Sequence, residues 1–338
     1  MSTDYALLTS FGSPLGSPAR SAGPHAPASR MLRVGLVQMR WRPDPQEHAD
    51  SLREGVRLAA AQGAEVVCLP ELTLSPYFAA AKELAATAGA YLEDLENGPT
   101  ATLATELATD LGCAVHASLY EAAEAAGAVG AVEAAGAAGY NTAICVGPDG
   151  TLLARTRKTH IPRFPGYHED LCFQPGDSGF PVHEIMPGAK FGFPTCWDQW
   201  FPELARAYAL NEAGILVYPT AIGSEPELPW FDTAPVWEHM ITANGLANAL
   251  FMIVPNRTGA EGPIAFYGSS FMSDPYGRVL LRAPRDRPAV LVADLDLQQR
   301  ADWLEFGLLR TRRPELYGPL TEPVRLKPRR RPSCADQP

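Results

Sequence analysis

Short apolar runs alternate along this chain with longer segments of helical periodicity, and this order constrains the fold more than any other feature. The predicted strands cover residues 32–39, 65–70, 113–120, 140–146, 152–158, 189–195, 215–219, 251–255, 268–273, 278–283 and 289–294. The predicted helices cover residues 46–62, 79–88, 100–111, 201–213 and 234–249. Because strand–helix–strand units are mixed with hairpins, we expect an α/β domain whose sheets are covered by helices.

Two segments of biased composition flank this pattern and a third interrupts it. Residues 1–30 are rich in Ser, Pro, Ala and Gly, and we expect a disordered, low-complexity extension. One domain is predicted at 31–322, followed by a basic, Pro-rich tail at 323–338. Residues 121–139 consist almost wholly of Ala, Gly, Val and Glu, which indicates an inserted flexible loop or weak helix.

The charge balance disfavours a nucleic-acid partner. The chain has 28 Lys and Arg residues against 38 Asp and Glu residues, a formal charge of −10 and a pI near 5.2. Phosphate binding needs a basic face, and the dense basic cluster at 329–331 is typical of a solvated tail. No uncharged apolar stretch reaches 18 residues, so we expect no membrane partner.

The cysteines indicate a reducing environment. Six cysteines lie far apart and form no CxxC pair, so a zinc ribbon or a thioredoxin-like site is not predicted. No basic-plus-apolar signal segment precedes the first predicted strand. We therefore expect a cytoplasmic protein with reduced thiols.

Three reactive side chains stand where predicted strands end. Cys196 follows the strand at 189–195, and a helix begins a few residues later, so its thiol could project from a sharp turn. Glu71 and Lys158 end two other strands. Each of these residues could instead have an ordinary structural role. Cys196 could be a packed thiol, Glu71 could cap a helix, and Lys158 could be a solvated lysine. Together, however, a carboxylate can accept the thiol proton, and an ammonium can stabilise a tetrahedral intermediate.

The chain resembles the nitrilase superfamily of carbon–nitrogen hydrolases. The matching segments follow the family's order over about residues 31–320. They are 69–72 (LPEL), 157–162 (RKTHIP), 196–203 (CWDQWFPE), 218–223 (YPTAIG), 256–259 (NRTG) and 266–271 (FYGSSF). The resemblance implies a four-layer α-β-β-α sandwich in a single domain. It also implies amide hydrolysis through a thioester, with no metal and no cofactor.

The same resemblance assigns catalytic roles by position. Cys196 matches the nucleophile, Glu71 the general base and Lys158 the residue that stabilises the oxyanion. Glu169, eleven residues after Lys158, matches a second active-site glutamate that would position Lys158 or the substrate nitrogen. Pro194 and Thr195 replace the aliphatic residues more usual before the nucleophile.

Four further residues are expected near the substrate, with Trp197 also lending its backbone N–H to the oxyanion. They are Trp197, Glu225, His160 and Tyr77. His160 could equally be a structural histidine. Glu225 could face a cationic amine through a charge-assisted hydrogen bond, or could be an ordinary surface glutamate.

Several segments resemble the branch of the superfamily that hydrolyses N-carbamoylputrescine, among them 165–169 (PGYHE), 219–226 (PTAIGSEP) and 312–317 (RRPELY). The expected substrate is therefore a small N-carbamoyl amine. Alternatives are N-carbamoyl-β-alanine or an N-carbamoyl amino acid, a simple aliphatic amide or a nitrile, an acyl-transfer reaction, or a non-catalytic protein that keeps the fold. The family also implies a homo-oligomer, in which the aromatic segment 303–323 could pack on a neighbouring subunit.

Overall fold

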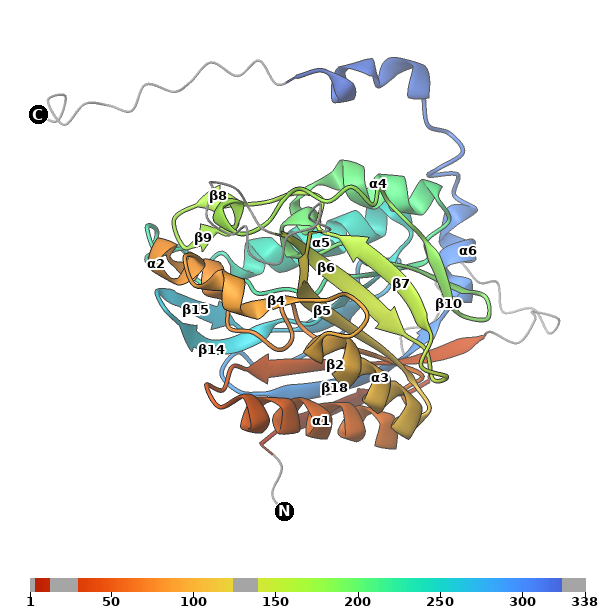
Figure 1. Ribbon diagram of the computed structural model, residues 1–338. Coiled ribbons are helices and arrows are strands. Elements are labelled where there is room, and N and C mark those ends of the chain that lie inside the picture. The colour runs from red at the N-terminus through yellow and green to blue at the C-terminus, as the bar shows by residue number, and fades with distance from the viewer. Residues whose placement is uncertain (1–3, 13–29, 124–138, 324–338) are drawn as a thin grey trace, which may run out of the picture.

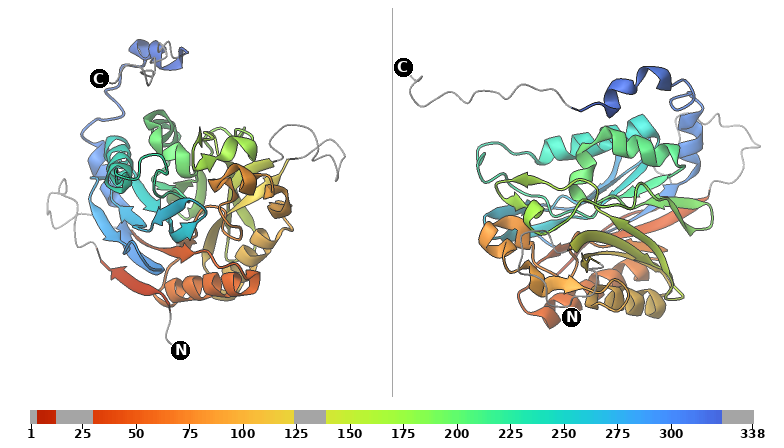
Figure 2. Two further views of the ribbon diagram at one scale, coloured as in Figure 1. Left: turned by 90° about the vertical axis from the view of Figure 1, so that its left-hand side faces the viewer. Right: turned by 45° about the horizontal axis from the view of Figure 1, so that its top comes forward.

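Two β-sheets packed face to face form the centre of the computed structural model, which describes residues 4–12, 30–123 and 139–323 (Figures 1 and 2). In spatial order, the larger sheet contains β1 (Ala6–Ser10), β18 (Ala289–Asp296), β2 (Met31–Arg40), β3 (Val66–Cys68), β5 (Ala114–Ala122), β6 (Gly139–Val146) and β7 (Leu152–Arg157). Beside this path, β14 (Arg257–Glu261) pairs with β2 and with β15 (Ile264–Tyr267), and β4 (Leu92–Glu93) pairs with β5.

The second sheet is formed by the later part of the chain. In order, it contains β10 (His183–Met186), β11 (Ala189–Gly192), β12 (Ile215–Val217), β13 (Phe251–Val254), β16 (Phe271–Ser273) and β17 (Val279–Arg282). A separate hairpin joins β8 (Arg163–Phe164) to β9 (Tyr167–His168). The α-helices are α1 (Pro45–Ala61), α2 (Lys82–Ala85), α3 (Pro99–Leu111), α4 (Pro202–Leu210), α5 (Ala234–Asn248) and α6 (Gln298–Leu304). Short 3₁₀ helices cover Phe78–Ala80, Ala88–Tyr91, Glu169–Leu171, Cys196–Trp200, Pro314–Leu316 and Gly318–Thr321.

The period-two alternation of the strands explains the layers. In β3, Val66 and Cys68 face the second sheet, while Val67 packs on the other side against α1 and α3. In β12, Ile215 and Val217 join the core between the sheets, while Leu216 packs toward α4 and α5. Both faces of β3 and of β12 are buried, as expected for central strands with helices on one side and a second sheet on the other. The predicted α-β-β-α sandwich is therefore confirmed (Figure 1).

Local sequence signals set the ends of the outer helices. The side chain of Asp44 accepts a hydrogen bond from the backbone N–H of Glu47 (2.8 Å), and Pro45 occupies the first turn of α1. Pro99 starts α3 in the same way, and Gly112 ends it in the left-handed conformation (φ 66°). These signals explain why the helices predicted at 46–62 and 100–111 are found close to those bounds.

The prediction that residues 1–30 are wholly disordered is wrong for residues 6–10, which form β1. This strand pairs in parallel with β18, at the opposite end of the sequence. Ala6 and Leu8 pack against the core between the sheets, and the buried Tyr5 donates a hydrogen bond to the backbone of Ser51. A five-residue strand next to a low-complexity stretch does not alter the average composition, so composition alone missed it. Residues 13–29 lie outside the described residues.

The bounds of the expected insertion at 121–139 also need correction. Glu121 and Ala122 are the last residues of β5, and Gly139 opens β6. Glu121 is buried, and its carboxylate forms ion pairs with Arg155 and Arg157 of β7. Residues 124–138 lie outside the described residues, as does the tail beyond residue 323.

Three predicted elements are shorter or more broken than expected. The helix at 79–88 is replaced by α2 and two 3₁₀ helices, because Ala81 has an extended conformation (φ −147°, ψ 153°). The strand at 189–195 ends at Gly192. Gly268 and Ser269 have positive φ angles and separate β15 from β16, where one strand was predicted at 268–273.

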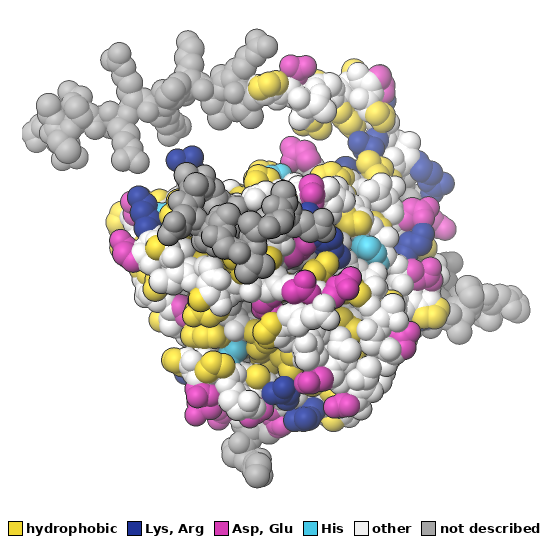
Figure 3. Space-filling model, viewed as in Figure 1, with side chains coloured by type: hydrophobic (Ala, Val, Ile, Leu, Met, Phe, Trp, Pro, Cys, Tyr) yellow, Lys and Arg dark blue, Asp and Glu magenta, His cyan; other side chains and the backbone are white. Residues whose placement is uncertain are grey.

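The outer surface shows interspersed charge on the face seen in Figure 3, where basic and acidic side chains alternate with hydrophobic ones. None of the helices in the described part of the chain is long and apolar enough to cross a membrane. After α6, the chain leaves the sandwich and extends away from it through the last two 3₁₀ helices (Figures 1 and 2). Phe306, Leu316 and Leu320 on this segment are 69%, 60% and 63% exposed.

Candidate active site

Three of the four predicted catalytic residues follow strands of the two large sheets, and the fourth follows the separate β8–β9 hairpin. Glu71 comes three residues after β3, and Lys158 directly follows β7. Cys196 begins a 3₁₀ helix after β11 of the second sheet, and Glu169 begins another after β9. All four residues are buried. The ends of strands far apart in sequence thus bring these groups together.

Lys158 lies between two carboxylates. Its Nζ donates to Oε1 of Glu71 (2.8 Å) and to Oε2 of Glu169 (2.6 Å), and all three side chains are fully buried. Burial alone disfavours an ammonium, but the negative charges of Glu169 and Glu71 raise the pKa of Lys158 above its usual value. The lysine therefore stays positively charged at neutral pH.

Asn141 of β6 orients the Glu71 carboxylate. Its Nδ2 donates to Oε1 of Glu71 (2.7 Å), and its Oδ1 accepts from the hydroxyl of Ser118 (3.2 Å). Oε2 of Glu71 is buried and has no hydrogen-bond partner among the described residues. One carboxylate oxygen is thus fixed by two donors, and the other is free to exchange a proton.

Cys196 has a strained backbone, with a φ of 42°, at the start of its 3₁₀ helix. Its backbone N–H donates to the carbonyl of Pro219 (3.0 Å). Burial raises the pKa of the Cys196 thiol well above its usual value, and the Glu71 charge adds to this effect, while the Lys158 ammonium opposes it. The resting group is therefore a thiol, and a neighbouring base must remove its proton.

Asp198 joins the segment of Cys196 to the segment of Lys158. Its carboxylate accepts from the backbone N–H of Thr195 (3.0 Å) and of His160 (2.9 Å). The Asp198 carboxylate thus caps the start of the 3₁₀ helix, while the Thr195 hydroxyl is buried with no hydrogen-bond partner among the described residues. His160 Nδ1 lies 2.7 Å from Asp198 Oδ1, and its ring stacks on Phe201 at 3.6 Å. The described contacts of His160 are thus with Asp198 and Phe201, not with Glu71, Lys158 or Glu169.

Tyr77 contacts the second glutamate directly. Its hydroxyl donates to Oε1 of Glu169 (2.8 Å). Burial raises the pKa of Glu169 to about 7, against the lowering effect of the Lys158 ammonium, and the Glu71 charge raises it further. Glu169 therefore holds one oxygen toward Lys158 and the other toward Tyr77.

A buried arginine that the sequence analysis assigned no role holds the segment that carries Glu71. Arg257 Nη2 donates to the backbone carbonyls of Glu71 (2.9 Å), Leu72 (2.7 Å) and Ser75 (2.8 Å). Its Nη1 donates to Glu261 (2.8 Å), whose other oxygen accepts from the backbone N–H of Tyr77 (2.7 Å). Leu72 has a φ of 52°, and these bonds stabilise that conformation.

The described contacts of Trp197 and Glu225, the two remaining predicted residues, are with groups other than the carboxylates of Glu71 and Glu169. Trp197 is partly buried and packs beside Phe164, with ring centroids 5.0 Å apart. Glu225 is half-buried, and burial raises its pKa. Burial raises the pKa of Tyr167, and the charges of Glu225 and Cys196 add to this effect, so both groups lie near this tyrosine. The Tyr167 hydroxyl bonds to both backbone groups of Gly223 (2.9 and 3.1 Å), close to Glu225 in the chain.

Within the described ranges, no group of three or more His, Cys, Asp or Glu side chains is arranged to hold a metal ion. The described groups with acid–base or nucleophilic chemistry in the site are two carboxylates, an ammonium and a thiol. Such a set suits nucleophilic attack on an acyl carbon, followed by proton transfer.

Comparison with known proteins identifies the family. The family Carbon-nitrogen hydrolase matches residues 33–304. An N-carbamoylputrescine amidase of Arabidopsis thaliana is 37% identical over 302 residues, covering 85% of this chain and 94% of that protein. A citrullinase of Francisella tularensis subsp. tularensis is 35% identical over 294 residues, covering 85% and 96%.

Solved structures agree with this assignment. A carbon-nitrogen hydrolase from Helicobacter pylori G27 has a TM-score of 0.74 and 29% identity, covering 87% of this chain and 99% of the other. An amidase mutant from Nesterenkonia sp. AN1, with acrylamide added at its active-site cysteine, has a TM-score of 0.64 and 26% identity, covering 85% and 98%. This chain is therefore a member of the carbon–nitrogen hydrolase family, within the nitrilase superfamily, and a hydrolase that acts on amides.

Proposed function

We propose that this enzyme hydrolyses the carbamoyl carbon–nitrogen bond of a small N-carbamoyl amine, using Cys196 as nucleophile. The observation that carries the proposal is the buried Glu71–Lys158–Glu169 network, whose charges act on the Cys196 thiol. A buried ammonium between two carboxylates costs desolvation energy, and such arrangements are typical of sites that stabilise charge during a reaction.

In the first half-reaction, the free Oε2 of Glu71 takes the proton of Cys196. The thiolate attacks the carbamoyl carbon, a C–S bond forms, and the carbonyl oxygen becomes an oxyanion. Lys158 and the backbone N–H of Trp197 stabilise this oxyanion. As the C=O bond re-forms, the C–N bond to the terminal nitrogen breaks. Glu71 returns its proton to that nitrogen, and ammonia leaves.

In the second half-reaction, Glu71 removes a proton from water, and the oxygen attacks the carbamoyl thioester. The C–S bond then breaks, and Cys196 regains a proton from Glu71. The product is an N-substituted carbamate, which takes up a proton and decomposes to an amine and CO₂. Because the same carboxylate moves a proton in each step, its fixed Oε1 and free Oε2 suit both half-reactions.

A solved relative supports the nucleophile. In the amidase from Nesterenkonia sp. AN1, acrylamide is attached to the active-site cysteine, and fluoroacetamide has left its acetamide group on that cysteine in another mutant. A carbon-nitrogen hydrolase of the same fold thus has a cysteine that attacks amide-bearing compounds. In this chain, the cysteine beside the buried glutamate and lysine is Cys196.

N-carbamoylputrescine is the substrate that we propose. Three plant relatives, from Arabidopsis thaliana, Solanum tuberosum and Solanum lycopersicum, carry the name N-carbamoylputrescine amidase. They are 36–37% identical to this chain. N-carbamoylputrescine has a terminal urea group at one end and an ammonium at the other. Glu225, whose charge acts on the same Tyr167 as that of Cys196, is a half-buried carboxylate with no basic partner among the described side chains. A carboxylate at that place favours a cationic substrate tail.

Ammonia release from three ureido compounds tests this proposal. N-carbamoylputrescine ends in a cation, N-carbamoyl-β-alanine in an anion and citrulline in an amino acid. Citrulline is included because a 35% identical relative is named citrullinase. We expect turnover of N-carbamoylputrescine with at least about a hundredfold higher kcat/KM than N-carbamoyl-β-alanine, since a buried like-charge contact disfavours the anion. A preference for the anion would contradict the substrate, and full activity of Cys196→Ala would contradict the mechanism.

We also propose that the enzyme is a cytoplasmic homo-oligomer in which the segment 303–323 packs on a second copy. Its exposed Phe306, Leu316 and Leu320 support this proposal, because large apolar side chains favour burial in an interface. The five described cysteines are free and buried, in keeping with a reducing compartment. Gel filtration that showed only monomer would contradict the oligomer.

A further inference from the structure

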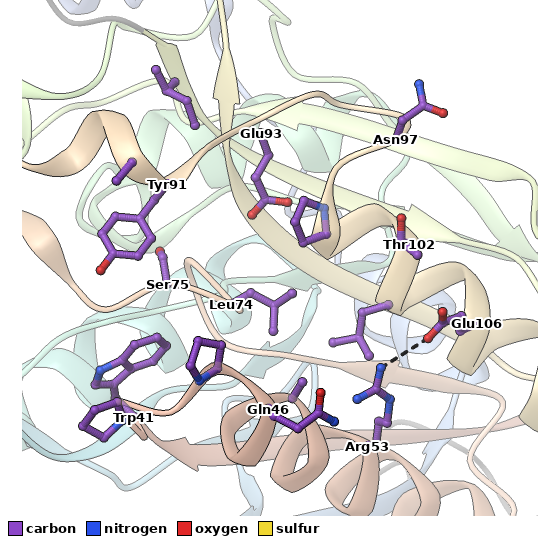
Figure 4. A pocket seen from close by; sticks show the side chains of 17 residues that line it. Trp41, Gln46, Arg53, Leu74, Ser75, Tyr91, Glu93, Asn97, Thr102 and Glu106 are labelled. Atoms are coloured by element: carbon purple, nitrogen blue, oxygen red, sulfur yellow. Dashed lines mark hydrogen bonds and ion pairs between the residues drawn. The ribbon is translucent and has the colours of Figure 1, made fainter.

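A pocket lies on the outer side of the larger sheet, between α1 and α3. Its volume is about 690 Å³, which lies in the range of small-molecule sites. Figure 4 shows its walls: Trp41 and Tyr91 at one end, Leu74 in the middle, and the Arg53–Glu106 pair at the other end. None of Glu71, Lys158, Glu169 and Cys196 lines it, so it is separate from the catalytic set.

The polar groups of this pocket carry an excess of negative charge. Glu93 points into the pocket (Figure 4) and is half-buried, and its described contacts are both with Thr100, at 2.7 and 2.8 Å. No Lys or Arg of the described residues lies within ion-pair distance of Glu93. Arg53 is already paired with Asp50 (3.1 Å) and Glu106 (3.3 Å). The carboxylate of Glu93 is therefore not neutralised by a cation.

A second observation points to a ligand. Ser75 lines the pocket, is 95% buried, and its Oγ has no hydrogen-bond partner among the described residues. A buried hydroxyl without a partner is costly unless a bound molecule or water supplies one. The pocket thus offers an unsatisfied hydroxyl and an unneutralised carboxylate, surrounded by apolar and aromatic walls.

We propose that this pocket binds a small organic amine in its cationic form. The ammonium faces Glu93, and the carboxylate has lone pairs left after its bonds to Thr100. The apolar body of the ligand packs between Trp41, Leu74 and Tyr91. Aromatic rings also attract a cation that lies over their faces, so the Glu93 carboxylate and the aromatic rings both favour a cationic ligand.

The pocket shares a chain segment with the active site. Leu74 and Ser75 line the pocket, and Glu71 lies three residues before Leu74. Arg257 bonds to the carbonyls of both Glu71 and Ser75. A ligand in the pocket therefore touches the segment that positions the carboxylate of the active site.

Calorimetric titration with three molecules of similar shape tests this proposal. The probes are 2-phenylethylamine, 2-phenylethanol and 3-phenylpropanoate, which present a cation, a neutral hydroxyl and an anion. Cys196 is first alkylated with iodoacetamide to block the active site, so the result does not depend on the proposed substrate. We expect the amine to bind at least about tenfold more tightly than the alcohol, since a hydrogen bond to a charged group is stronger than one between neutral groups.

Two variants and a matched control locate the site. Glu93→Gln keeps an acceptor for Thr100 but removes the charge, and we expect it to weaken amine binding about tenfold. Trp41→Leu should also weaken binding of the amine, because the aromatic ring that contacts the ligand is lost. Glu96→Gln changes an exposed carboxylate three residues away and should have no effect. Equal binding of all three probes, unchanged amine binding in a folded Glu93→Gln protein, or no binding to the alkylated enzyme would overturn the proposal.

Discussion

Asn141 Nδ2 lies 2.7 Å from Oε1 of Glu71, the same oxygen that accepts the hydrogen bond from Lys158. This shared contact leaves Oε2 of Glu71 buried and unpartnered among the described residues. The carboxylate is therefore held on one side and available on the other.

Glu71→Gln should lower kcat by about 10²–10⁴-fold, because the amide cannot remove the proton of Cys196 or of water. The amide oxygen can still accept from Asn141 and Lys158, so the fold should persist. Ammonia release measures the loss, and thermal unfolding checks the fold. Glu203→Gln, on the exposed start of α4, is the control and should be as active as the unmodified enzyme. Full turnover by Glu71→Gln would show that another group is the base.

Asn141→Asp should move the acidic limb of the kcat/KM profile toward higher pH. The new carboxylate would lie against Glu71, and a like charge disfavours the ionised form of its neighbour. The base would then become active only at higher pH, by about one unit. A lower rate with an unchanged pH profile would indicate that Asn141 affects only the packing of the site.

Lys158→Met should slow the alkylation of Cys196 by iodoacetamide at any fixed pH. The Lys158 ammonium lowers the pKa of the thiol, in opposition to burial and to Glu71, so its removal raises that pKa further and reduces the thiolate fraction. Peptide mass spectrometry across a pH series measures the reaction at each cysteine separately. Faster alkylation of Cys196 in Lys158→Met would contradict this sign.

Glu225→Gln should reduce kcat/KM for N-carbamoylputrescine by about tenfold or more, since a charge-assisted contact to the ammonium is lost. N-carbamoyl-β-alanine should be affected much less. Glu227→Gln changes a more exposed carboxylate in the same loop and serves as the matched control. Equal losses for both substrates would indicate that Glu225 only supports the loop.

Arg257→Met should lower the free energy of unfolding by about 3–5 kcal/mol, because it leaves buried Glu261 unpaired and three carbonyls without their donor. Urea unfolding measures this loss. Arg282→Met removes an exposed ion pair with Glu238 and should cost at most about 1 kcal/mol. Similar losses in the two variants would contradict the importance assigned to Arg257.

The sequence was informative where local pattern decides structure. Helix α1 has its cap and its proline in the sequence, and β3 and β12 are short apolar runs, so each could be predicted without a partner. Glu71, Lys158 and Cys196 could be singled out because each lies at the end of a predicted strand. The family resemblance then added Glu169, whose contact with Lys158 no spacing rule implies.

The residues that position the site could not be predicted in this way. Asn141 is one polar residue inside a strand, and its partner Glu71 lies 70 positions earlier. Arg257 holds carbonyls more than 180 positions away. Strand β1 likewise depends on a partner at the far end of the chain. Such pairings arise when the sandwich packs, so neither composition nor periodicity predicts them.

The most direct test of the mechanism is to stop the reaction with acid during turnover of N-carbamoylputrescine. The mass of the peptide that contains Cys196 is then measured by mass spectrometry. The account predicts a fraction of this peptide with the added mass of one 4-aminobutylcarbamoyl group, carried as a thioester on the sulfur. It also predicts that Cys196→Ala gives no adduct and no ammonia. Continued turnover by Cys196→Ala would contradict the central claim that Cys196 is the nucleophile.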